Sequence, residues 1–511
     1  MSLTVPVSEI VSESHNPLLG IHSLWKRVEL STIAKILNGF AFESKYFNRA
    51  TGVPLLRIRD IGNNTTGCFY GGPFDAEYLV RAGDLVVGMD GDFKCALWQG
   101  TDALLNQRVC KVELLTANYN PVFLELVLPA YLDAINENTS SQTVRHLSSR
   151  SVAEIPVPLP PLSEQERIVV KIEALLAQVN AARERLARVP KILKRFRQAI
   201  LAAACSGRLT EDWRKSNPQG DGVKKLLADV LSRRKHRTKE SGLGRYHEPC
   251  QPDTTFLSEV PEEWELASMD QLTCLVTSGS RGWAKYYVDS GPYFIRAENI
   301  NTDSLRLRGV AHVDPPNNAE GRRTRIERGD LLVTITGANV TKSALVEIDL
   351  PEAYVSQHIA LVRPIDPSLG QFLYLWAVSP NQGRAKLIND AYGAGKPGLN
   401  LDNIKEMPVG LPSIDERREI VRRVGALFNL ADMIEKRVEA AMTRADKLTQ
   451  AILAKAFRGE LVPTEAELAR REDRTYEPAS VLLERIKVER ERATQKSDDK
   501  RPRHKATAGR R

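Results

Sequence analysis

The segment Ile155-Pro-Val-Pro-Leu-Pro-Pro-Leu-Ser-Glu-Gln-Glu-Arg-Ile168 occurs a second time, in altered form, as Met407-Pro-Val-Gly-Leu-Pro-Ser-Ile-Asp-Glu-Arg-Arg-Glu-Ile420. The copies are 252 residues apart (407 − 155), and the same offset relates Gln198-Ala-Ile-Leu201 to Gln450-Ala-Ile-Leu453 without a gap. An internal repeat of this length predicts a duplicated half-molecule with pseudo-two-fold symmetry. A protein built in this way is suited to a target that has two ends.

After each copy of this segment, apolar residues recur at alternating spacings of four and three over five heptads, with charged residues between them. This pattern predicts two long helices that pair as an antiparallel intramolecular coiled coil. An amphipathic helix packed only on its own domain is the alternative. The residues expected to pair the helices are Ile168, Ile172, Leu175, Val179, Leu186, Ile420, Val424, Leu427, Ile434 and Val438.

Several residues predict where these helices begin, bend and end. Ser163-Glu-Gln-Glu166 has the sequence of a capping box, and the acidic Asp415-Glu416 suits the first turn of the second helix. Pro190 removes a backbone donor and predicts a kink or break in the first helix only. Gly207 and Gly459 occur where C-terminal caps are expected.

The segment before each helix has short β-branched runs separated by Gly-Asp and Gly-Asn turns, which predicts a mixed α+β domain. Framework stretches recur, for example Leu56-Arg-Ile-Arg-Asp-Ile61 and Ile295-Arg-Ala-Glu-Asn-Ile300, whereas the loops between them diverge. Two domains that recognise different targets would show this pattern. The expected boundaries are an N-terminal segment 1–24, a first domain 25–160, a helix 161–210, a short helix and linker 211–260, a second domain 261–412, a second helix 413–461, and a C-terminal helix with a basic tail 462–511.

Composition limits the class of protein. The chain has 511 residues, 42% of them hydrophobic and 27% charged, which is typical of a globular protein with several domains. Its net charge of +8 favours a polyanionic partner, although ordinary surface charge explains it equally well. No signal peptide or membrane-spanning run is evident, and the six cysteines lack metal-ligand spacing, so we expect a cytoplasmic protein without a metal.

These motifs together resemble the specificity subunit of type I restriction-modification systems, over nearly the whole chain. The resemblance rests on the segments 157–168 and 409–420, on 198–209 and 450–461, and on a variable domain before each pair. It implies a non-catalytic DNA-binding protein with two target recognition domains, each of which binds one half of a bipartite, asymmetric duplex site. It also implies two methyltransferase (modification) subunits and two translocase/nuclease (restriction) subunits as partners. S-adenosylmethionine, ATP and Mg would then be bound by these partners, and the chain itself would need no cofactor.

Three other functions are alternatives to this one. A self-sufficient DNA adenine methyltransferase would need a glycine-rich cofactor loop after a strand and an Asn/Asp-Pro-Pro-Tyr-type loop. Tyr392–Gly398 and Asp314-Pro-Pro-Asn317 do not fit these requirements, and no nuclease or ATP-binding motif is present. The specificity subunit of a related type IIG/IIB-like system remains an alternative, whereas the two diverged domains disfavour a coiled-coil scaffold without DNA function.

Candidate DNA contacts are cationic, amide and aromatic side chains in the divergent loops and beside the framework strands. Lys and Arg would bind phosphates, and a few Arg, Asn or His side chains would contact base edges. A solvated surface charge is the alternative for each charged candidate, and a buried aromatic side chain is the alternative for Trp283. The candidates are Lys45, Arg57, Arg59, Lys94, Arg108 and Arg145 in the first domain, and Arg281, Trp283, Arg296, Asn299, Lys342, His358 and Lys396 in the second.

The two helices also suggest how the gap between half-sites is set. One heptad of helix is ~10.5 Å long, which equals about three base pairs of duplex. We therefore expect the spacing between the half-sites to follow the length of the helices.

Overall fold

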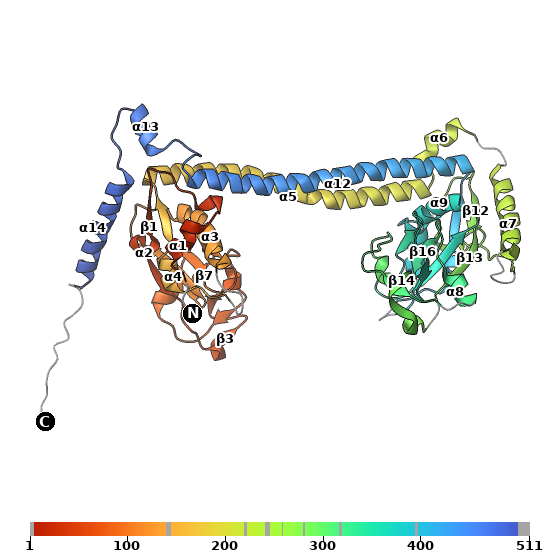
Figure 1. Ribbon diagram of the computed structural model, residues 1–511, viewed down its shortest axis with the longest axis horizontal. Coiled ribbons are helices and arrows are strands. Elements are labelled where there is room, and N and C mark those ends of the chain that lie inside the picture. Colours follow the sequence, from red (N-terminus) through yellow and green to blue (C-terminus); the bar gives the residue numbers. More distant parts are fainter. Residues whose placement is uncertain are drawn as a thin grey trace, which may run out of the picture. The chain divides into compact units, whose positions relative to one another are not determined.

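The computed structural model describes residues 5–138, 145–218, 222–240, 246–257, 259–279, 282–315, 319–393 and 397–498. The chain forms two compact units. Unit 1 consists of Met1–Leu186 and Ala440–Arg511, and unit 2 consists of Ala187–Glu439. Each of the two long helices, α5 (Leu162–Cys205) and α12 (Ile414–Phe457), therefore contributes one half to each unit (Figure 1).

Unit 1 contains a four-stranded antiparallel sheet and a second sheet with one parallel pair. The order of the first sheet is β2 (Ala34–Asn38), β10 (Val109–Leu114), β7 (Leu85–Gly88), β8 (Cys95–Leu97). In the second sheet, β4 (Val53–Leu56) runs parallel to β9 (Ala103–Leu105). The strands β3 (Phe47–Asn48), β5 (Phe69–Tyr70) and β6 (Leu79–Val80) complete it.

Unit 2 repeats the four-stranded sheet strand by strand, whereas its second sheet has, among the described residues, three strands where that of unit 1 has five. Its four-stranded sheet has the order β13 (Thr273–Ser278), β19 (Ile359–Pro364), β16 (Leu331–Thr334), β17 (Ser343–Leu345). Its parallel pair is β14 (Tyr287–Ile295) and β18 (Ala353–Val355), with β15 (Ala311–Val313) antiparallel to β14. A two-stranded ribbon also occurs in each unit: β1 (Lys26–Glu29) with β11 (Pro156–Leu159), and β12 (Glu265–Ser268) with β20 (Pro408–Leu411). The predicted α+β class is confirmed.

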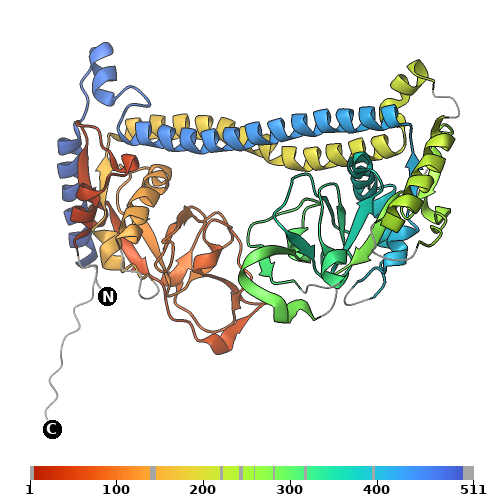
Figure 2. The ribbon, with the colours of Figure 1, turned by 45° about the vertical axis from the view of Figure 1, so that its right-hand side comes forward.

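Helices cover the sheets and close the core of each unit. In unit 1 the core joins α3 (Pro121–Glu137) and α1 (Val7–Glu13) to apolar side chains of α5, α12 and α14 (Ala479–Asp498). Asn120 caps α3 by accepting from the backbone N–H groups of Val122 and Phe123. In unit 2, α9 (Pro367–Val378) corresponds to α3. The helix α7 (Gly222–Glu240), which follows α5 as α14 follows α12, also packs on the core of this unit. Figure 2 shows α14 beside the N-terminal part of its own unit, and α7 along the sheet of its own unit.

The two long helices are in contact and run antiparallel, as the heptad pattern predicts. In unit 1, Arg183 of α5 pairs with Asp446 of α12. In unit 2, Arg197 of α5 pairs with Asp432 at 2.6 Å and with Glu435 at 2.9 Å. From Arg183 to Arg197 α5 advances by 14 residues, and from Asp446 to Asp432 α12 goes back by 14, which is two heptads in opposite directions.

All ten residues expected to pair the helices are buried or half-buried. Ile168, Ile172 and Val179 belong to the core of unit 1, and Ile420 and Val424 belong to the core of unit 2. Leu175 and Leu427 pack against these cores. Leu186, Ile434 and Val438 are half-buried. The ends of the long helices therefore also pack on their own domains, so the two alternatives drawn from the sequence hold together.

Two details of the long helices differ from expectation. α5 continues through Pro190, so the expected break is wrong. Ser163 lies inside the first turn, because α5 begins at Leu162 and the N–H groups of Glu164 and Gln165 bond to the carbonyl of Pro161. Its hydroxyl donates to Glu465 at 2.9 Å, so the predicted capping box is absent. In the second copy Ser413 accepts from the N–H of Glu416 at 3.2 Å and does cap α12.

The ends of the long helices agree with the sequence. Gly207 and Gly459 follow α5 and α12 with a φ of 70°, the left-handed conformation of a C-terminal cap. Within the segment 211–260, predicted as a short helix and linker, the helix α7 extends to Glu240.

A buried carboxylate begins each long helix at the same repeat position. Glu164 accepts from the indole N–H of Trp25 at 3.1 Å and from the backbone N–H of Glu465 at 3.0 Å. Burial raises the pKa of Glu164 above its ordinary value, and these two hydrogen bonds oppose the rise. Glu416 accepts from the indole N–H of Trp264 at 3.0 Å.

Glu416 has further partners that Glu164 lacks. Its carboxylate accepts from the hydroxyl of Thr210 at 2.8 Å and pairs with Arg214. Glu416 thus connects the start of α12 to the residue before strand β12 and to the segment that follows α5.

Candidate nucleic-acid interface

In each unit two parallel strands end side by side and place polar residues at one edge. In unit 1, β4 leads into Arg57 and β9 leads into Asn106, Gln107 and Arg108. In unit 2, β14 leads into Arg296 and β18 leads into Ser356, Gln357 and His358. Side chains at the carboxyl ends of neighbouring parallel strands lie close together, so this edge is a natural place for a binding surface.

Arg57 and Arg296 occupy the same framework position. Each is the N-cap of a short 3₁₀ helix, and its backbone N–H donates to the side chain three residues later. The acceptor is Asp60 in unit 1 at 3.0 Å and Asn299 in unit 2 at 2.9 Å. An acid and an amide are interchangeable here because the frame needs only an oxygen acceptor.

A second group of side chains meets at the turn between β7 and β8. Asp90 pairs with Arg108 at 3.1 Å and with His146 Nδ1 at 2.6 Å. Arg108 is 54% exposed and His146 is 42% exposed, so both face solvent. Asp90, which its glycine-rich setting suggests to be a turn residue, therefore orients two solvent-facing groups.

The same backbone arrangement recurs at the turn between β16 and β17. The N–H of Met89 donates to Arg108 O at 2.9 Å, and the N–H of Ile335 donates to His358 O at 2.9 Å. The N–H of Gly91 donates to Arg145 O at 3.1 Å, and the N–H of Gly337 donates to Pro397 O at 3.2 Å. Isolated bridges then join Asp90 to His146 in unit 1, and Thr336 to Gly398 in unit 2.

The side chains on this common backbone differ. Where unit 1 has Arg108, unit 2 has His358, whose Nδ1 lies 2.5 Å from the hydroxyl of Thr336. Asp90 is replaced by Thr336, and His146 by Gly398. Lys94 and Lys342 are alike, since each accepts through its backbone carbonyl at the end of the turn. The frame is duplicated while the groups that it presents are not.

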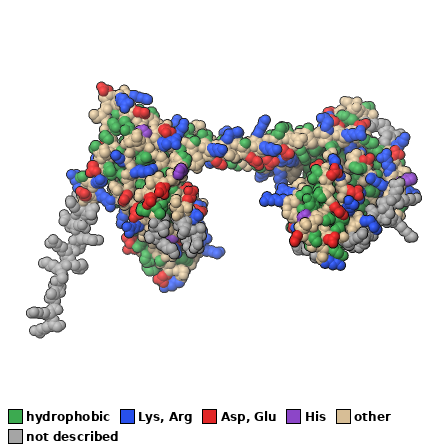
Figure 3. Space-filling view, in the orientation of Figure 1, with side chains coloured by type: hydrophobic (Ala, Val, Ile, Leu, Met, Phe, Trp, Pro, Cys, Tyr) green, Lys and Arg blue, Asp and Glu red, His purple; other side chains and the backbone are tan. Residues whose placement is uncertain are grey.

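The remaining candidates of unit 1 are at the surface or close to it. Lys45 pairs with Glu43 at 2.5 Å and lies 4.8 Å from the ring of Tyr46. Arg145 donates to Asn136 at 3.0 Å. Arg57 is half-buried with Asp60 at 3.8 Å, and Arg59 and Lys94 are exposed. Lys and Arg side chains stand out from the visible surface of both units (Figure 3).

The candidates of unit 2 other than Trp283 divide into three groups. Arg296, Lys342 and His358 are half-buried near the surface; Arg296 pairs with Glu298, and Lys342 pairs with Asp303 at 3.4 Å. Asn299 is 2% exposed, and its amide also donates to Arg306 O at 3.0 Å, so we withdraw it as a base contact. Arg281 and Lys396 lie outside the described residues.

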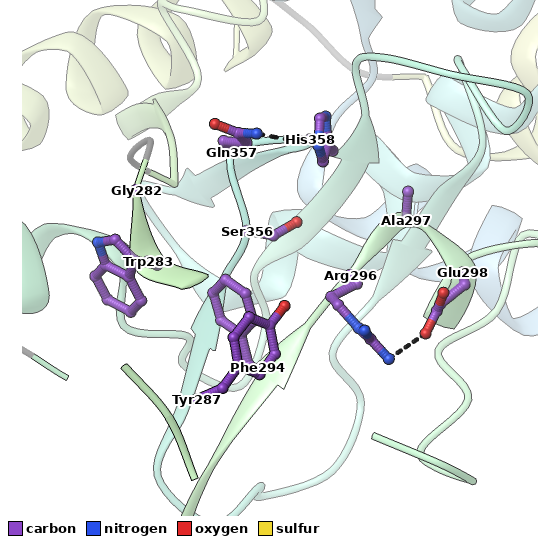
Figure 4. A pocket seen from close by; sticks show the side chains of 10 residues that line it. All are labelled: Gly282, Trp283, Tyr287, Phe294, Arg296, Ala297, Glu298, Ser356, Gln357 and His358. Carbon is purple, nitrogen blue, oxygen red and sulfur yellow. Dashed lines mark hydrogen bonds and ion pairs between the residues drawn. The ribbon is translucent and has the colours of Figure 1, made fainter. Parts of the chain in front are cut away.

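Trp283 is only 3% exposed, so it is not an exposed contact. It forms one wall of a pocket. Its ring stacks on Phe294 with centroids 5.6 Å apart. Gln357, His358, Ser356 and Arg296 line the other side of the same pocket (Figure 4). Sequence reasoning did not identify Asp90, His146, Thr336 or this pocket, and only the repeated positions 106–108 and 356–358 indicated the edge on which they lie.

The described residues also bear on metals and membranes. Among them, His, Cys, Asp and Glu side chains form no group of three or more with an arrangement suited to a metal ion. None of the helices that the structure describes combines the length and apolar character needed to span a bilayer.

Known proteins share the sequence and the architecture of this chain. The family model of the type I restriction modification DNA specificity domain matches residues 22–191 and 315–444. The EcoBI specificity subunit of Escherichia coli is 38% identical over 498 residues, which cover 96% of this chain and 97% of the relative. The EcoKI specificity subunit of Escherichia coli K12 is 27% identical, covering 91% and 95%.

A solved structure has the same fold. A chain from a study of complex assembly and conformational transition of the type I R-M system superposes with a TM-score of 0.57. It is 18% identical and covers 85% of this chain and 98% of that one. Given the duplicated domains, the paired helices and these matches, the chain belongs to the family of type I restriction enzyme specificity subunits.

Proposed function

We propose that this chain is a non-catalytic DNA-recognition subunit of a type I restriction-modification complex. Its recognition domains, 25–160 and 261–412, each bind one half of a bipartite, asymmetric duplex site. The catalytic steps and their cofactors belong to the partner subunits, two for modification and two for restriction.

The observation that carries this proposal is the shared backbone with unlike side chains. Arg108 with Asp90 and His146 in unit 1, and His358 with Thr336 in unit 2, stand on equivalent hydrogen-bonded frames. A bidentate guanidinium matches the O6 and N7 edge of guanine, whereas an imidazole offers a single donor or acceptor to a base. Two such surfaces favour different base sequences.

Phosphate contacts supply the affinity. Lys45 and Arg59 lie in the short 3₁₀ helices Ser44–Tyr46 and Ile58–Asp60 of unit 1. Lys94 in unit 1 and Lys342 in unit 2 lie at the ends of equivalent turns. Their positive charge suits sequence-independent contacts that orient the duplex.

The long helices and their surfaces suit the partner proteins. Several apolar side chains on them are strongly exposed, and a bound partner protein would remove them from water. They are Val170 and Ile192 on α5, and Leu430, Met433 and Leu448 on α12. We infer that the modification subunits dock on these helices.

Salt dependence tests the DNA-binding function. The purified chain, assembled with its modification subunits, is titrated with duplex DNA at several salt concentrations. We expect log K to fall with log [salt] at about −0.9 per phosphate contacted, and Lys94→Ala to reduce the slope by about one. Arg150→Ala serves as a control because this exposed arginine of α4 (Ser149–Ala153) already pairs with Glu154. A salt-independent affinity, or methyl transfer by the chain alone, would contradict the proposal.

Lengthening both helices tests whether they set the gap between the half-sites. One heptad is inserted after Arg188 in α5 and another after Ala440 in α12, which preserves the register of both ion pairs. We expect the gap in the recognised site to grow by about three base pairs. Insertion into α5 alone should abolish assembly or binding, because it shifts the register of one ion pair. An unchanged gap in the doubly lengthened chain would show that the helices do not set it.

A further inference from the structure

We propose that the pocket of unit 2 between Trp283, Phe294 and Ser356 holds a single nucleobase displaced from the bound duplex. This inference rests on the proposed DNA-recognition function and adds a step of recognition within one half-site. The pocket has a volume of about 310 Å³, which is at the lower end of the range for small-ligand sites.

One side of the pocket is aromatic. Trp283 and Phe294 are 3% and 4% exposed, and their rings are nearly parallel, with an interplanar angle of 15°. Tyr287 meets Phe294 edge-on at 5.5 Å and is itself 43% exposed (Figure 4). The exposed ring of Tyr287, which packs against the buried pair of rings, is an aromatic surface on which a displaced base can stack, and stacking requires no particular base.

The other side is polar and has an unmet hydrogen-bonding group. Ser356 is 4% exposed, and its hydroxyl, which lines the pocket, has no hydrogen-bond partner. A buried hydroxyl without a hydrogen-bond partner destabilises the protein because the group has lost its hydrogen bonds to water. A ligand that forms a hydrogen bond with it would therefore bind more tightly. The amide of Gln357 and the imidazole of His358 lie beside it.

Arg296 adds a donor but does not distinguish the two units. Its Nε has no hydrogen-bond partner, and neither has the Nε of Arg57 at the equivalent position of unit 1. The serine hydroxyl and the aromatic wall are therefore the features on which this inference depends. A hydroxyl, an amide and an imidazole together can match the mixed donors and acceptors of a base edge.

The position of the pocket indicates where its occupant comes from. Ser356, Gln357 and His358 follow β18, and Arg296 follows β14, so the pocket opens at the edge proposed to contact DNA. A base displaced from the second half-site would need to leave the duplex only locally to enter it.

Mismatched duplexes test this inference, since displacing an unpaired base costs less than displacing a paired one. The chain assembled with its modification subunits is titrated with duplexes that carry one mismatch at each position of the second half-site in turn. We expect one position at which a mismatch tightens binding about tenfold. Ala297→Leu, which adds bulk to the wall of the pocket, should abolish that gain, and Ser356→Ala should reduce it about threefold.

Mismatches in the first half-site are the control, and both variants should bind those duplexes as the unaltered chain does. A misfolded variant would lose this binding and can be recognised by it. Should no mismatch tighten binding, or should the gain persist in Ala297→Leu, the pocket is not a base site. Failure to bind the intact site specifically would instead contradict the proposed function itself.

Discussion

Replacing Glu416 with alanine is expected to lower the free energy of unfolding by about 3–5 kcal/mol. The carboxylate is 1% exposed, and its loss leaves the Trp264 indole, the Thr210 hydroxyl and the Arg214 guanidinium without this acceptor. Arg214 is itself only 11% exposed, so a charge would remain buried with Glu263, 3.6 Å away, as its nearest replacement. Urea-induced unfolding followed by tryptophan fluorescence measures the change.

Two variants calibrate this expectation. Asp415→Ala removes an exposed neighbour, 67% exposed and paired with Arg418, and should change stability by no more than about 0.5 kcal/mol. Glu164→Ala should cost about 1–3 kcal/mol, because it leaves only the indole N–H of Trp25 and one backbone N–H unpaired. If Glu416→Ala is as mild as Asp415→Ala, this carboxylate does not hold the unit together.

Replacing Arg108 with alanine is expected to weaken binding of the recognised duplex by about 1–3 kcal/mol and to relax the preference at one base pair. Arg108 is 54% exposed, and Asp90 holds it in place at 3.1 Å. The change should be confined to the half-site that unit 1 binds. Competition binding with duplexes substituted at one base pair at a time measures it.

His358→Ala is the matched experiment in unit 2, because His358 occupies the equivalent position. It should relax one position in the other half-site and leave the first half-site unchanged. If Arg108→Ala weakens all duplexes equally, Arg108 contacts a phosphate. If either variant affects both half-sites alike, the two domains do not recognise DNA independently.

The long helices were the most predictable part of the fold. α5 and α12 begin and end at positions that differ by 252 residues, the offset of the sequence repeat. Heptad spacing indicates which face of a helix is buried, and a glycine at the C-terminal end indicates a residue in the left-handed conformation. Both features can therefore be predicted from the sequence alone. The prediction of a capping box at Ser163 was wrong because a serine near the start of a helix can hydrogen-bond to a distant glutamate instead of to its own backbone.

The binding surface was only partly predictable. The repeated stretches 106–108 and 356–358 indicated the edge of each domain on which the candidate interface lies. However, Asp90 and His146 are 56 residues apart, and only the bridge between their backbones brings them together. Asn299 shows the opposite error: a framework amide has the chemistry of a base contact, but the fold uses both ends of it internally.

Mapping the methylated sites in a host that carries this chain with its modification subunits tests whether the two domains recognise different half-sites. We expect two half-sites of different sequence, separated by a gap of fixed length, because equivalent frames present Arg108 in one domain and His358 in the other. A single uninterrupted site, or two identical half-sites, would contradict it.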